Sequence, residues 1–259
     1  MTKTILITGA TDGIGLLTAQ KLASEGHKVL IHGRSADKLT AAADAVGGRP
    51  QTYRADLSRM EEVETLAQAV IADHGTLDVV INNAGVLKSP IVETEAGRDI
   101  RFDVNTIAPY ILALRLLPRV PNDGRIVNLS SAAQSPVDLN ALRTFRPMGD
   151  MDAYAQSKLA ITIWTAELAK ALPEGPVVVS VNPGSLLASK MVKDGFGIAG
   201  NDLNIGADIL IRAALGDDFA TASGRYFDND SGDFGPIQAT AAEAASLMQA
   251  LYDITGLSF

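Results

Sequence analysis

A glycine-rich turn stands near the start of the chain, directly between a strand pattern and a helix pattern. Residues 4–8 form an apolar, β-branched run, the turn reads Thr8-Gly9-Ala10-Thr11-Asp12-Gly13-Ile14-Gly15, and a helical pattern covers 14–25. Three glycines let the backbone approach a pyrophosphate closely, and the start of the helix offers unpaired N–H groups to it. The turn lacks the closing Gly-Lys-Ser/Thr of a P-loop. We therefore predict a nucleotide-binding unit, against the alternative of an ordinary glycine-rich turn.

Strand and helix patterns alternate along the rest of the chain. Strands are predicted at 4–8, 28–32, 51–55, 78–81, 125–129, 177–181 and 225–227, and helices at 14–25, 37–46, 59–74, 97–117 (bent at Pro109), 153–172 and 239–251. Runs such as Val177-Val178-Val179 are wholly apolar, as in parallel strands covered by helices on both faces. The alternation predicts one α/β domain over residues 1–259, a Rossmann-type doubly wound parallel sheet of about seven strands flanked by helices. Its ligand crevice is expected at the carboxyl ends of the strands.

Composition excludes several classes of protein. The 259 residues are 47% hydrophobic and 20% charged, which is typical of a globular protein. The absence of cysteine excludes disulfides and thiolate sites, and the three histidines lack metal-ligand spacing, so no metal is expected. A net charge of −8 disfavours nucleic acid as a partner. Neither a long apolar run nor a signal-peptide pattern is found, so we expect a cytoplasmic protein without a membrane partner.

The end of the second strand bears on the choice of cofactor. An NAD site usually has an acid about 20 residues beyond the glycines, where it accepts from the ribose 2′-hydroxyl. Here the strand ends in His32-Gly33-Arg34-Ser35, without a carboxylate. Gly33 leaves room, and the guanidinium of Arg34 suits a 2′-phosphate. We therefore expect NADP(H) rather than NAD(H), unless Arg34 is an ordinary solvated arginine.

A second group of reactive side chains lies beyond the fifth strand. Tyr154 and Lys158 are four residues apart and share a face of a predicted helix, while Ser130-Ser131 follows the strand. A phenol is a poor acid–base at neutral pH, and a fixed ammonium lowers its pKa. A serine hydroxyl can hold a carbonyl oxygen on which negative charge develops. Together these groups suit hydride transfer with a nicotinamide cofactor.

The motifs together resemble those of the short-chain dehydrogenase/reductases over nearly the whole chain. The matching pieces are the turn 8–15, Asp56-Leu57, Asn82-Asn83-Ala84-Gly85, Asn105, Ser131, Tyr154-x-x-x-Lys158 and Pro183-Gly184. The resemblance implies that Asn105, Ser131, Tyr154 and Lys158 are catalytic. It also implies that the cofactor is bound by Thr8, Gly9, Thr11, Asp12, Gly13, Ile14, Gly15, Arg34, Ser35, Asp56, Leu57, Asn83, Ala84, Gly85, Tyr154, Lys158, Pro183, Gly184 and Ser189.

Individual roles follow from the same resemblance. Tyr154 is the acid–base, Lys158 holds the nicotinamide ribose, and Ser131 orients the carbonyl. Asp56 binds the adenine amino group, with Leu57 beside it. Asn83 holds the loop after the fourth strand against the glycine turn. Asn105 lies where a bent helix holds a water that links the lysine to solvent.

Two segments depart from the common pattern of the family and are expected to form substrate loops, 132–153 and 185–203. Ser131 and Tyr154 are 23 residues apart, a longer gap than in many members and similar to that of retinol-dehydrogenase-like members. The extra segment either covers the substrate or is a surface insertion. After Pro183-Gly184, Ala188 stands where many relatives have threonine, and Ser189 is its expected replacement. The glycine-containing segment 185–203 is either a mobile lid or a permanently packed loop.

The predicted function is therefore hydride transfer between NADP(H) and the carbonyl or alcohol carbon of a small or partly hydrophobic substrate. Interleaved apolar residues in 185–203 favour a hydrophobic part of the substrate, while Arg143 and Arg146 leave an acidic end open. The alternatives are a non-catalytic NAD(P)-sensing regulator of the same fold, an epimerase or dehydratase, and an enoyl reductase. Family members often form dimers or tetramers through the two long helices, so a homodimer or homotetramer is expected. Trp164 is then either core or a subunit contact.

Overall fold

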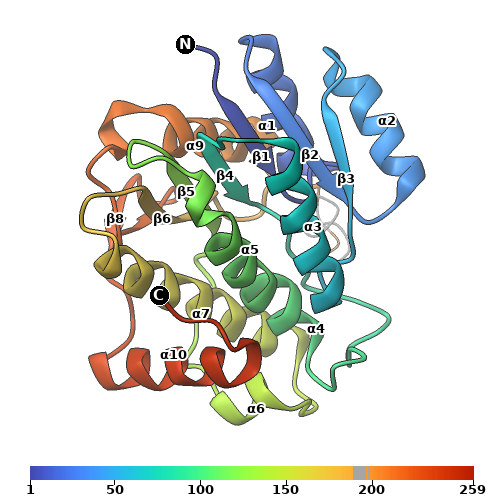
Figure 1. Cartoon of the computed structure of the whole chain (residues 1–259). Helices are drawn as coiled ribbons and strands as arrows, with labels where there is room; N and C mark the ends of the chain where they lie inside the picture. Colours follow the sequence, from blue (N-terminus) through green and yellow to red (C-terminus); the bar gives the residue numbers. More distant parts are fainter. Residues whose placement is uncertain (189–196, 198) are drawn as a thin grey trace.

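The sheet has eight strands in the order β3-β2-β1-β4-β5-β6-β7-β8, seen in the computed structural model (Figure 1), which describes residues 1–188, 197 and 199–259. The strands are β1 (Thr4–Ile7), β2 (Lys28–Gly33), β3 (Gln51–Arg54), β4 (Val79–Asn82), β5 (Arg125–Leu129), β6 (Val177–Asn182), β7 (Tyr226–Asp228) and β8 (Asp233–Gly235). Strands β1 to β7 are parallel, which confirms the predicted doubly wound sheet, and β8 pairs antiparallel with β7. The strand order reverses direction at β1 and β4, so their carboxyl ends border a crevice.

Helices cover both faces of the sheet. One face packs on α1 (Gly13–Ser24), α2 (Ala36–Val46) and α9 (Leu203–Leu215), and the other on α3 (Met60–Asp73), α5 (Ala108–Leu116) and α7 (Asp150–Ala171). Neighbouring strand residues serve opposite layers: Ile5 and Ile7 lie in the first core, whereas Leu6 lies in the second. Two buried faces explain the wholly apolar strands. Within the described part of the chain, every helix is too short or too polar to cross a bilayer.

The helix predicted at 97–117 is interrupted, and not where its proline predicted a bend. A short helix α4 (Ile100–Phe102) passes into a π-helical turn, Asp103–Ile107, and then into α5. Pro109 lies in the first turn of α5, where a missing N–H is tolerated. The irregular turn therefore precedes the proline. Such π-helical turns frequently occur at functional sites.

The C-terminal helix α10 (Ala241–Thr255) packs on α7 and on the short helix α6 (Leu139–Arg143). Beneath it Trp164 is fully buried, with its ring 5.7 Å from that of Tyr110, and the Tyr110 hydroxyl donates to the carbonyl of Leu257. Trp164 is therefore a core residue. Since α3 also packs on α5, little of α5 and α7 is left accessible for the subunit contact expected from the sequence.

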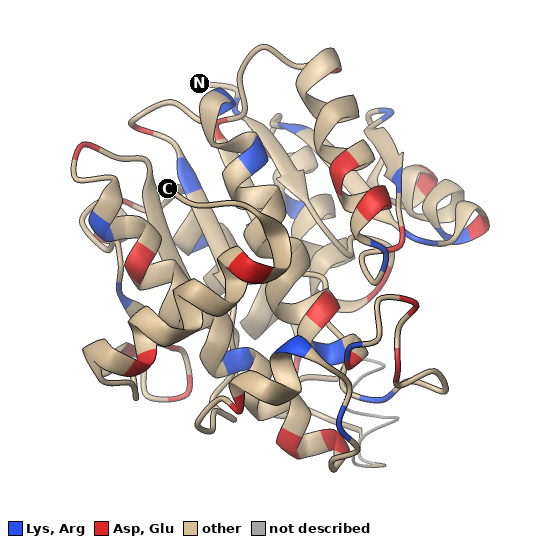
Figure 2. Cartoon of the chain, turned by 60° about the horizontal axis from the view of Figure 1, so that its bottom comes forward, with Lys and Arg blue, Asp and Glu red and all other residues tan. Residues whose placement is uncertain are grey.

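Charged side chains connect elements across the surface. Arg115 of α5 pairs with Glu64 of α3 at 2.8 Å, and Lys21 of α1 pairs with Asp208 of α9 at 2.5 Å. Basic and acidic positions are interspersed over the elements visible in Figure 2. These exposed pairs each contribute little to stability, so burial of the two apolar faces is the main stabilising term.

Candidate active site

A cavity of about 670 Å³ opens at the carboxyl ends of the strands and joins the two groups of residues singled out from the sequence. Of the predicted residues, the following line it: Gly9, Thr11, Asp12, Gly13, Ile14, Gly15, Arg34, Ser35, Asp56, Leu57, Asn83, Ala84, Gly85, Tyr154, Lys158 and Pro183. Four others, Thr8, Asn105, Ser131 and Gly184, contact or adjoin lining residues instead. Ser189 lies outside the described residues. The structure thus brings the glycine turn, Arg34, Tyr154 and Lys158 to one cavity.

The glycines are required because the loop after β4 packs directly on the turn. Asn83 Nδ2 donates to the carbonyls of Thr8 at 2.8 Å and Gly9 at 3.1 Å. A Cβ atom at Gly15 would lie 2.4 Å from Asn83 Nδ2 and 2.5 Å from the Gly9 oxygen. Gly9 and Gly13 have positive φ angles of 65° and 54°. The close packing leaves the first turn of α1 lining the cavity, where helix N–H groups favour a phosphate.

Asp12 has a local role in this turn. It is the N-cap of α1, and its carboxylate accepts from the N–H of Gly13 at 2.8 Å. Side-chain capping satisfies one of the N–H groups that a helix start leaves without a partner. The carboxylate therefore orders the turn itself.

His32 was not singled out from the sequence, and it connects this turn to the residue that follows β3. Its Nδ1 accepts from the Gly9 N–H at 3.2 Å, and its Nε2 lies 3.0 Å from the Ala55 carbonyl oxygen. One nitrogen must accept and the other donate, which only the neutral ring can do. Burial accordingly lowers the pKa of His32 to about 4. The neutral imidazole thus holds the glycine turn at its place beside β2.

Two cations stand at the far end of the cavity, at the start of α2. Arg34 is exposed and makes no ion pair with the described residues, and Lys38, four residues later, also lines the cavity. Ser35, between them, caps α2 by accepting from the Lys38 N–H. Lys38 was not predicted from the sequence, because it lies within α2 and beyond the strand end from which the cofactor was argued. Together Arg34 and Lys38 form a positive site suited to a phosphate.

Gly33 lines the cavity and also has a packing role. A Cβ atom there would lie 2.3 Å from Cγ2 of Thr11. Thr11 of the glycine turn therefore packs directly on Gly33, which also lines the cavity. The glycine allows β2 and the turn to pack closely.

Lys158 and Tyr154 lie at the other end of the cavity. Lys158 is 3% exposed, its Nζ donates to the Leu129 carbonyl at 2.7 Å, and the same atom is 5.6 Å from the centroid of the Tyr154 ring. Burial lowers the pKa of Lys158 to about 7. It also raises the pKa of Tyr154, although the hydroxyl of Ser131 acts in the opposite direction. The expected lowering of the tyrosine pKa is therefore not found in the protein alone, because desolvation outweighs the hydrogen bond with Ser131.

The two serines after β5 have different surroundings. Ser130 is buried, and its hydroxyl donates to the Lys158 carbonyl at 3.0 Å and lies 2.6 Å from that of Thr162. Ser131 is half-buried; its hydroxyl accepts from the Ala133 N–H at 3.1 Å and interacts with the Tyr154 hydroxyl. Ser130 thus fastens α7 to the sheet, and Ser131 is the serine beside the phenol.

Asn105 lies in the π-helical turn and is buried. Its Oδ1 accepts from the Val86 N–H at 2.8 Å, while Nδ2 donates to the Val86 carbonyl at 2.9 Å and to Ser157 Oγ at 3.0 Å. Both of its N–H groups are engaged, so the side chain holds the loop after β4 rather than offering a free donor to a water.

The longer Ser-to-Tyr segment is joined to the rest of the protein by the side chain of Arg143 and the backbone of Phe145, while Arg146 pairs within the segment. Arg143 pairs with Asp253 of α10 at 3.0 Å, and Arg146 lies 4.0 Å from Asp138. The Phe145 N–H donates to the Gly97 carbonyl at 2.7 Å. Both arginines therefore have carboxylate partners already, which disfavours the acidic substrate end that they had left open.

The base of the segment 185–203 is closed by backbone hydrogen bonds. The Ala188 N–H donates to Asn201 at 2.7 Å, and the Asn201 N–H donates to Leu186 at 2.6 Å. Asp230 holds the start of the segment, since its carboxylate accepts from the N–H and hydroxyl of Ser185 at 2.8 and 2.5 Å. The lid predicted from the glycines falls mostly on residues 189–196 and 198, outside the described residues.

Comparison with known proteins finds a family model, sequence relatives and solved structures that this chain resembles. Residues 3–196 match the family model described as short chain dehydrogenase. The chain is 31% identical over 251 residues to human retinol dehydrogenase 13, covering 87% of this chain and 76% of that protein. An uncharacterized protein of Mycobacterium paratuberculosis has a similar structure (TM-score 0.82, 28% identity, 99% of this chain and 94% of that one). A Shigella flexneri short chain dehydrogenase in complex with NADP is similar at a TM-score of 0.69 and 28% identity, over 88% of this chain and 96% of that chain.

Proposed function

Because the chain belongs to the short-chain dehydrogenase family, an oxidoreductase fold that uses a nicotinamide cofactor, we propose that it interconverts an alcohol and a carbonyl compound with NADP(H). The observation that carries this proposal is the single cavity that joins the glycine turn and two cations at one end with Tyr154 and Lys158 at the other. A phosphate-binding end and an acid–base end in one space are what a hydride-transfer enzyme needs.

The lining residues fit a dinucleotide phosphate. The turn 9–15 and the start of α1 would hold the pyrophosphate, and Asp56 with Leu57 would lie at the adenine. Arg34 and Lys38 would hold the 2′-phosphate, because a guanidinium and an ammonium without other partners among the described residues suit its charge. This positive pair, together with the NADP complex of the Shigella relative, supports NADP(H) over NAD(H).

At the other end, the reacting oxygen would lie between Ser131 and Tyr154. When bound, the nicotinamide supplies or accepts a hydride at the substrate carbon. The Ser131 hydroxyl donates to the carbonyl oxygen, and Tyr154 transfers its proton to that oxygen as the alcohol forms. Lys158, fixed on the Leu129 carbonyl, stabilises the phenolate that remains and holds the ribose hydroxyls. The raised tyrosine pKa keeps the phenol protonated, which suits the direction of reduction.

The wall beside these residues is mostly apolar. Part of this wall comes from the loop after β4, and part comes from α4 and the π-helical turn that follows it. Its lining residues are Val86, Leu87, Lys88, Pro90, Ile100 and Val104. Such a wall supports a substrate with a hydrophobic part, and the name of the human relative points to the same class. Of the two expected substrate loops, 132–153 and 185–203, the described residues that precede α7 and those that follow Gly184, 132–149 and 185–188, are proposed to complete the substrate site.

Two measurements test the proposed function. Purified protein is titrated with NADPH and NADH, and a panel of apolar aldehydes and ketones is then followed by the absorbance of the reduced nicotinamide. We expect tighter binding of NADPH and its oxidation by at least one carbonyl compound. Binding of NADPH without turnover of any compound in either direction would favour the sensing alternative instead.

A further inference from the structure

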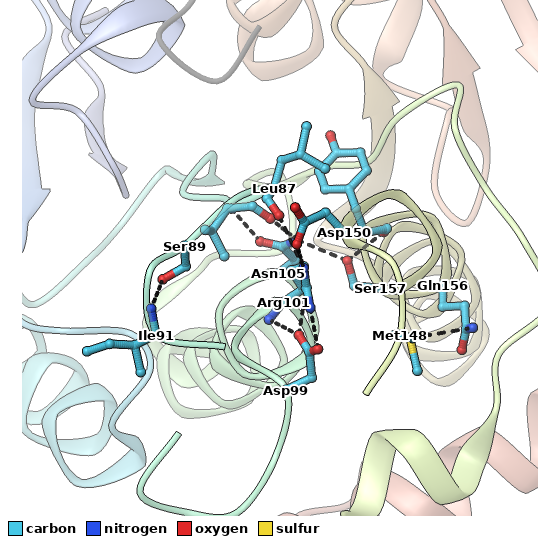
Figure 3. Close-up of polar contacts among 12 residues, drawn as sticks. Leu87, Ser89, Ile91, Asp99, Arg101, Asn105, Met148, Asp150, Gln156 and Ser157 are labelled. Carbon is cyan, nitrogen blue, oxygen red and sulfur yellow. Dashed lines mark hydrogen bonds and ion pairs between the residues drawn. The ribbon is translucent and has the colours of Figure 1, made fainter. Parts of the chain in front are cut away.

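A buried arginine connects the cavity wall to the helix that carries Tyr154. Arg101 of α4 is 1% exposed. Its guanidinium makes a bidentate ion pair with Asp99, in which Nε donates to Oδ1 at 2.7 Å and Nη2 donates to Oδ2 at 2.5 Å. Its Nη1 contacts the carboxylate of Asp150 in the first turn of α7 and lies 3.5 Å from the Leu87 carbonyl oxygen. Figure 3 shows Arg101 between these partners. Because a buried cation is costly without partners, its position is fixed by all three contacts.

Asn105 makes a second connection between the same two parts of the protein. It holds both backbone polar groups of Val86 on the cavity side and the hydroxyl of Ser157 on α7. The backbone carbonyl of Ser157 also accepts from the hydroxyl of Thr106 at 2.9 Å. The irregular segment 100–107 thus acts as a spacer between the loop 86–90 and α7.

The two connections bracket Tyr154 along its helix. Asp150 lies four residues before Tyr154 and Ser157 three residues after it, so all three share one face of α7. Arg101 and Asn105 are also four residues apart. The phenol therefore stands between two fixed points that are tied to the loop forming the opposite wall.

We propose that Arg101 is a positioning residue, whose contact with Asp150 sets the distance between the Tyr154 hydroxyl and a substrate held against the loop 86–90. This role rests on the proposed function. Arg101, Asp99 and Asp150 do not line the cavity, so they act through Tyr154 and the loop. Holding reacting groups in place matters because a displacement of about 1 Å can reduce a rate 10²-fold.

Asp150→Ala tests the proposal, with Asp152→Ala as its matched control. Asp150 is the most exposed member of the group, with 41% of its side chain accessible, so its removal leaves the buried pair of Arg101 and Asp99 intact. Asp152 is an exposed acid in the same first turn and makes no ion pair with the described residues. Both changes remove one negative charge from the start of α7, so only the contact with Arg101 distinguishes them.

Four quantities are measured in both variants: kcat, the Kd for NADPH, the primary isotope effect and the rate of hydrogen exchange. We expect Asp150→Ala to lower kcat about 10- to 100-fold while the Kd for NADPH stays unchanged, because the phosphate end is untouched. The primary isotope effect with NADPH deuterated at the transferred position should rise, since hydride transfer becomes more rate-limiting. Hydrogen exchange of peptides covering 86–91 should become faster, although they lie some 60 residues from position 150 in the sequence. Asp152→Ala should match the wild type in all four.

The outcomes separate the two proposals. Equal kcat and exchange in Asp150→Ala and Asp152→Ala would overturn the positioning role alone. A loss of kcat in Asp150→Ala accompanied by a proportional loss of NADPH affinity would also overturn it, because general loosening then explains the effect. Failure of the wild type to bind NADPH would overturn the proposed function, and with it any catalytic role for Arg101.

Discussion

Replacement of His32 by glutamine should reduce the sensitivity of the protein to acid. Burial lowers the pKa of His32 from 6.5 to about 4, because loss of water around the charged ring outweighs the hydrogen bond to the Ala55 carbonyl and the nearby carboxylate of Asp56, which both raise the pKa. Below pH 6.5 the unfolded chain binds a proton at this position that the folded protein excludes, so acid favours unfolding. The free energy of unfolding should therefore fall by about 2 kcal/mol between pH 7 and pH 5, and by about 3 kcal/mol by pH 4, from this residue alone. Above pH 6.5 His32 is mostly neutral in both the folded and the unfolded protein, so its contribution to the free energy of unfolding is fully present there.

Urea unfolding of the wild type and His32→Gln at pH 7 and pH 5 measures this difference. Glutamine also offers one donor and one acceptor but does not titrate in this range. All other titrating groups, including His74, whose pKa is also lowered, are common to both proteins and cancel in the comparison. We expect the wild type to lose about 2 kcal/mol more than the variant between the two pH values. An equal loss in both would refute the buried, neutral state assigned to His32.

Two further predictions concern the cofactor end. Arg34→Ala should weaken NADPH about 10- to 100-fold and leave NADH nearly unchanged, because a charge-assisted bond to the 2′-phosphate contributes about 1.5–3 kcal/mol; fluorescence titration with both cofactors measures this, and equal weakening of the two would contradict the assignment. Gly15→Ala should lower Tm and abolish NADPH binding, since its Cβ would lie 2.4 Å from Asn83 Nδ2, whereas Gly75→Ala, with nothing within 4 Å of the added atom, should do neither. Comparable Tm values for the two alanine variants would show that the turn tolerates a side chain.

The main elements of the fold were predictable because each depends on local sequence. Apolar runs bounded by turn residues predicted the parallel strands, and the helical period between them predicted five of the six covering helices. The helix α9 was not predicted. The strand β8 was missed because Asp233-Phe234-Gly235 has a single apolar residue between an acid and a glycine. The start of α7 was predicted near 153 instead of at Asp150, because Gly149 provides no side-chain capping signal. The π-helical turn before Pro109 was not predictable either, since its contacts come from the loop after β4 and from α7.

The candidate site was predictable where parallel strands end at the same edge. The glycine turn follows β1 and Ser131 follows β5, so the sheet brings them toward one crevice. His32 and Arg101 were missed because their importance lies in partners distant in sequence, such as Gly9 and Asp150. The predicted direction of the Tyr154 pKa shift was wrong, because the shift depends on burial, which residue spacing does not reveal.

The central claim is that Tyr154 is the proton donor for hydride transfer within the cavity. Its most direct test is single-turnover reduction of an apolar aldehyde with NADPH deuterated at the transferred position, in the wild type and in Tyr154→Phe, with deuterium in the alcohol measured by mass spectrometry. We predict deuterium at the carbinol carbon with the wild type, and a rate at least about 10²-fold lower in Tyr154→Phe with NADPH affinity and Tm retained. A Tyr154→Phe variant that is folded, binds NADPH and reduces the aldehyde at the wild-type rate would contradict the account.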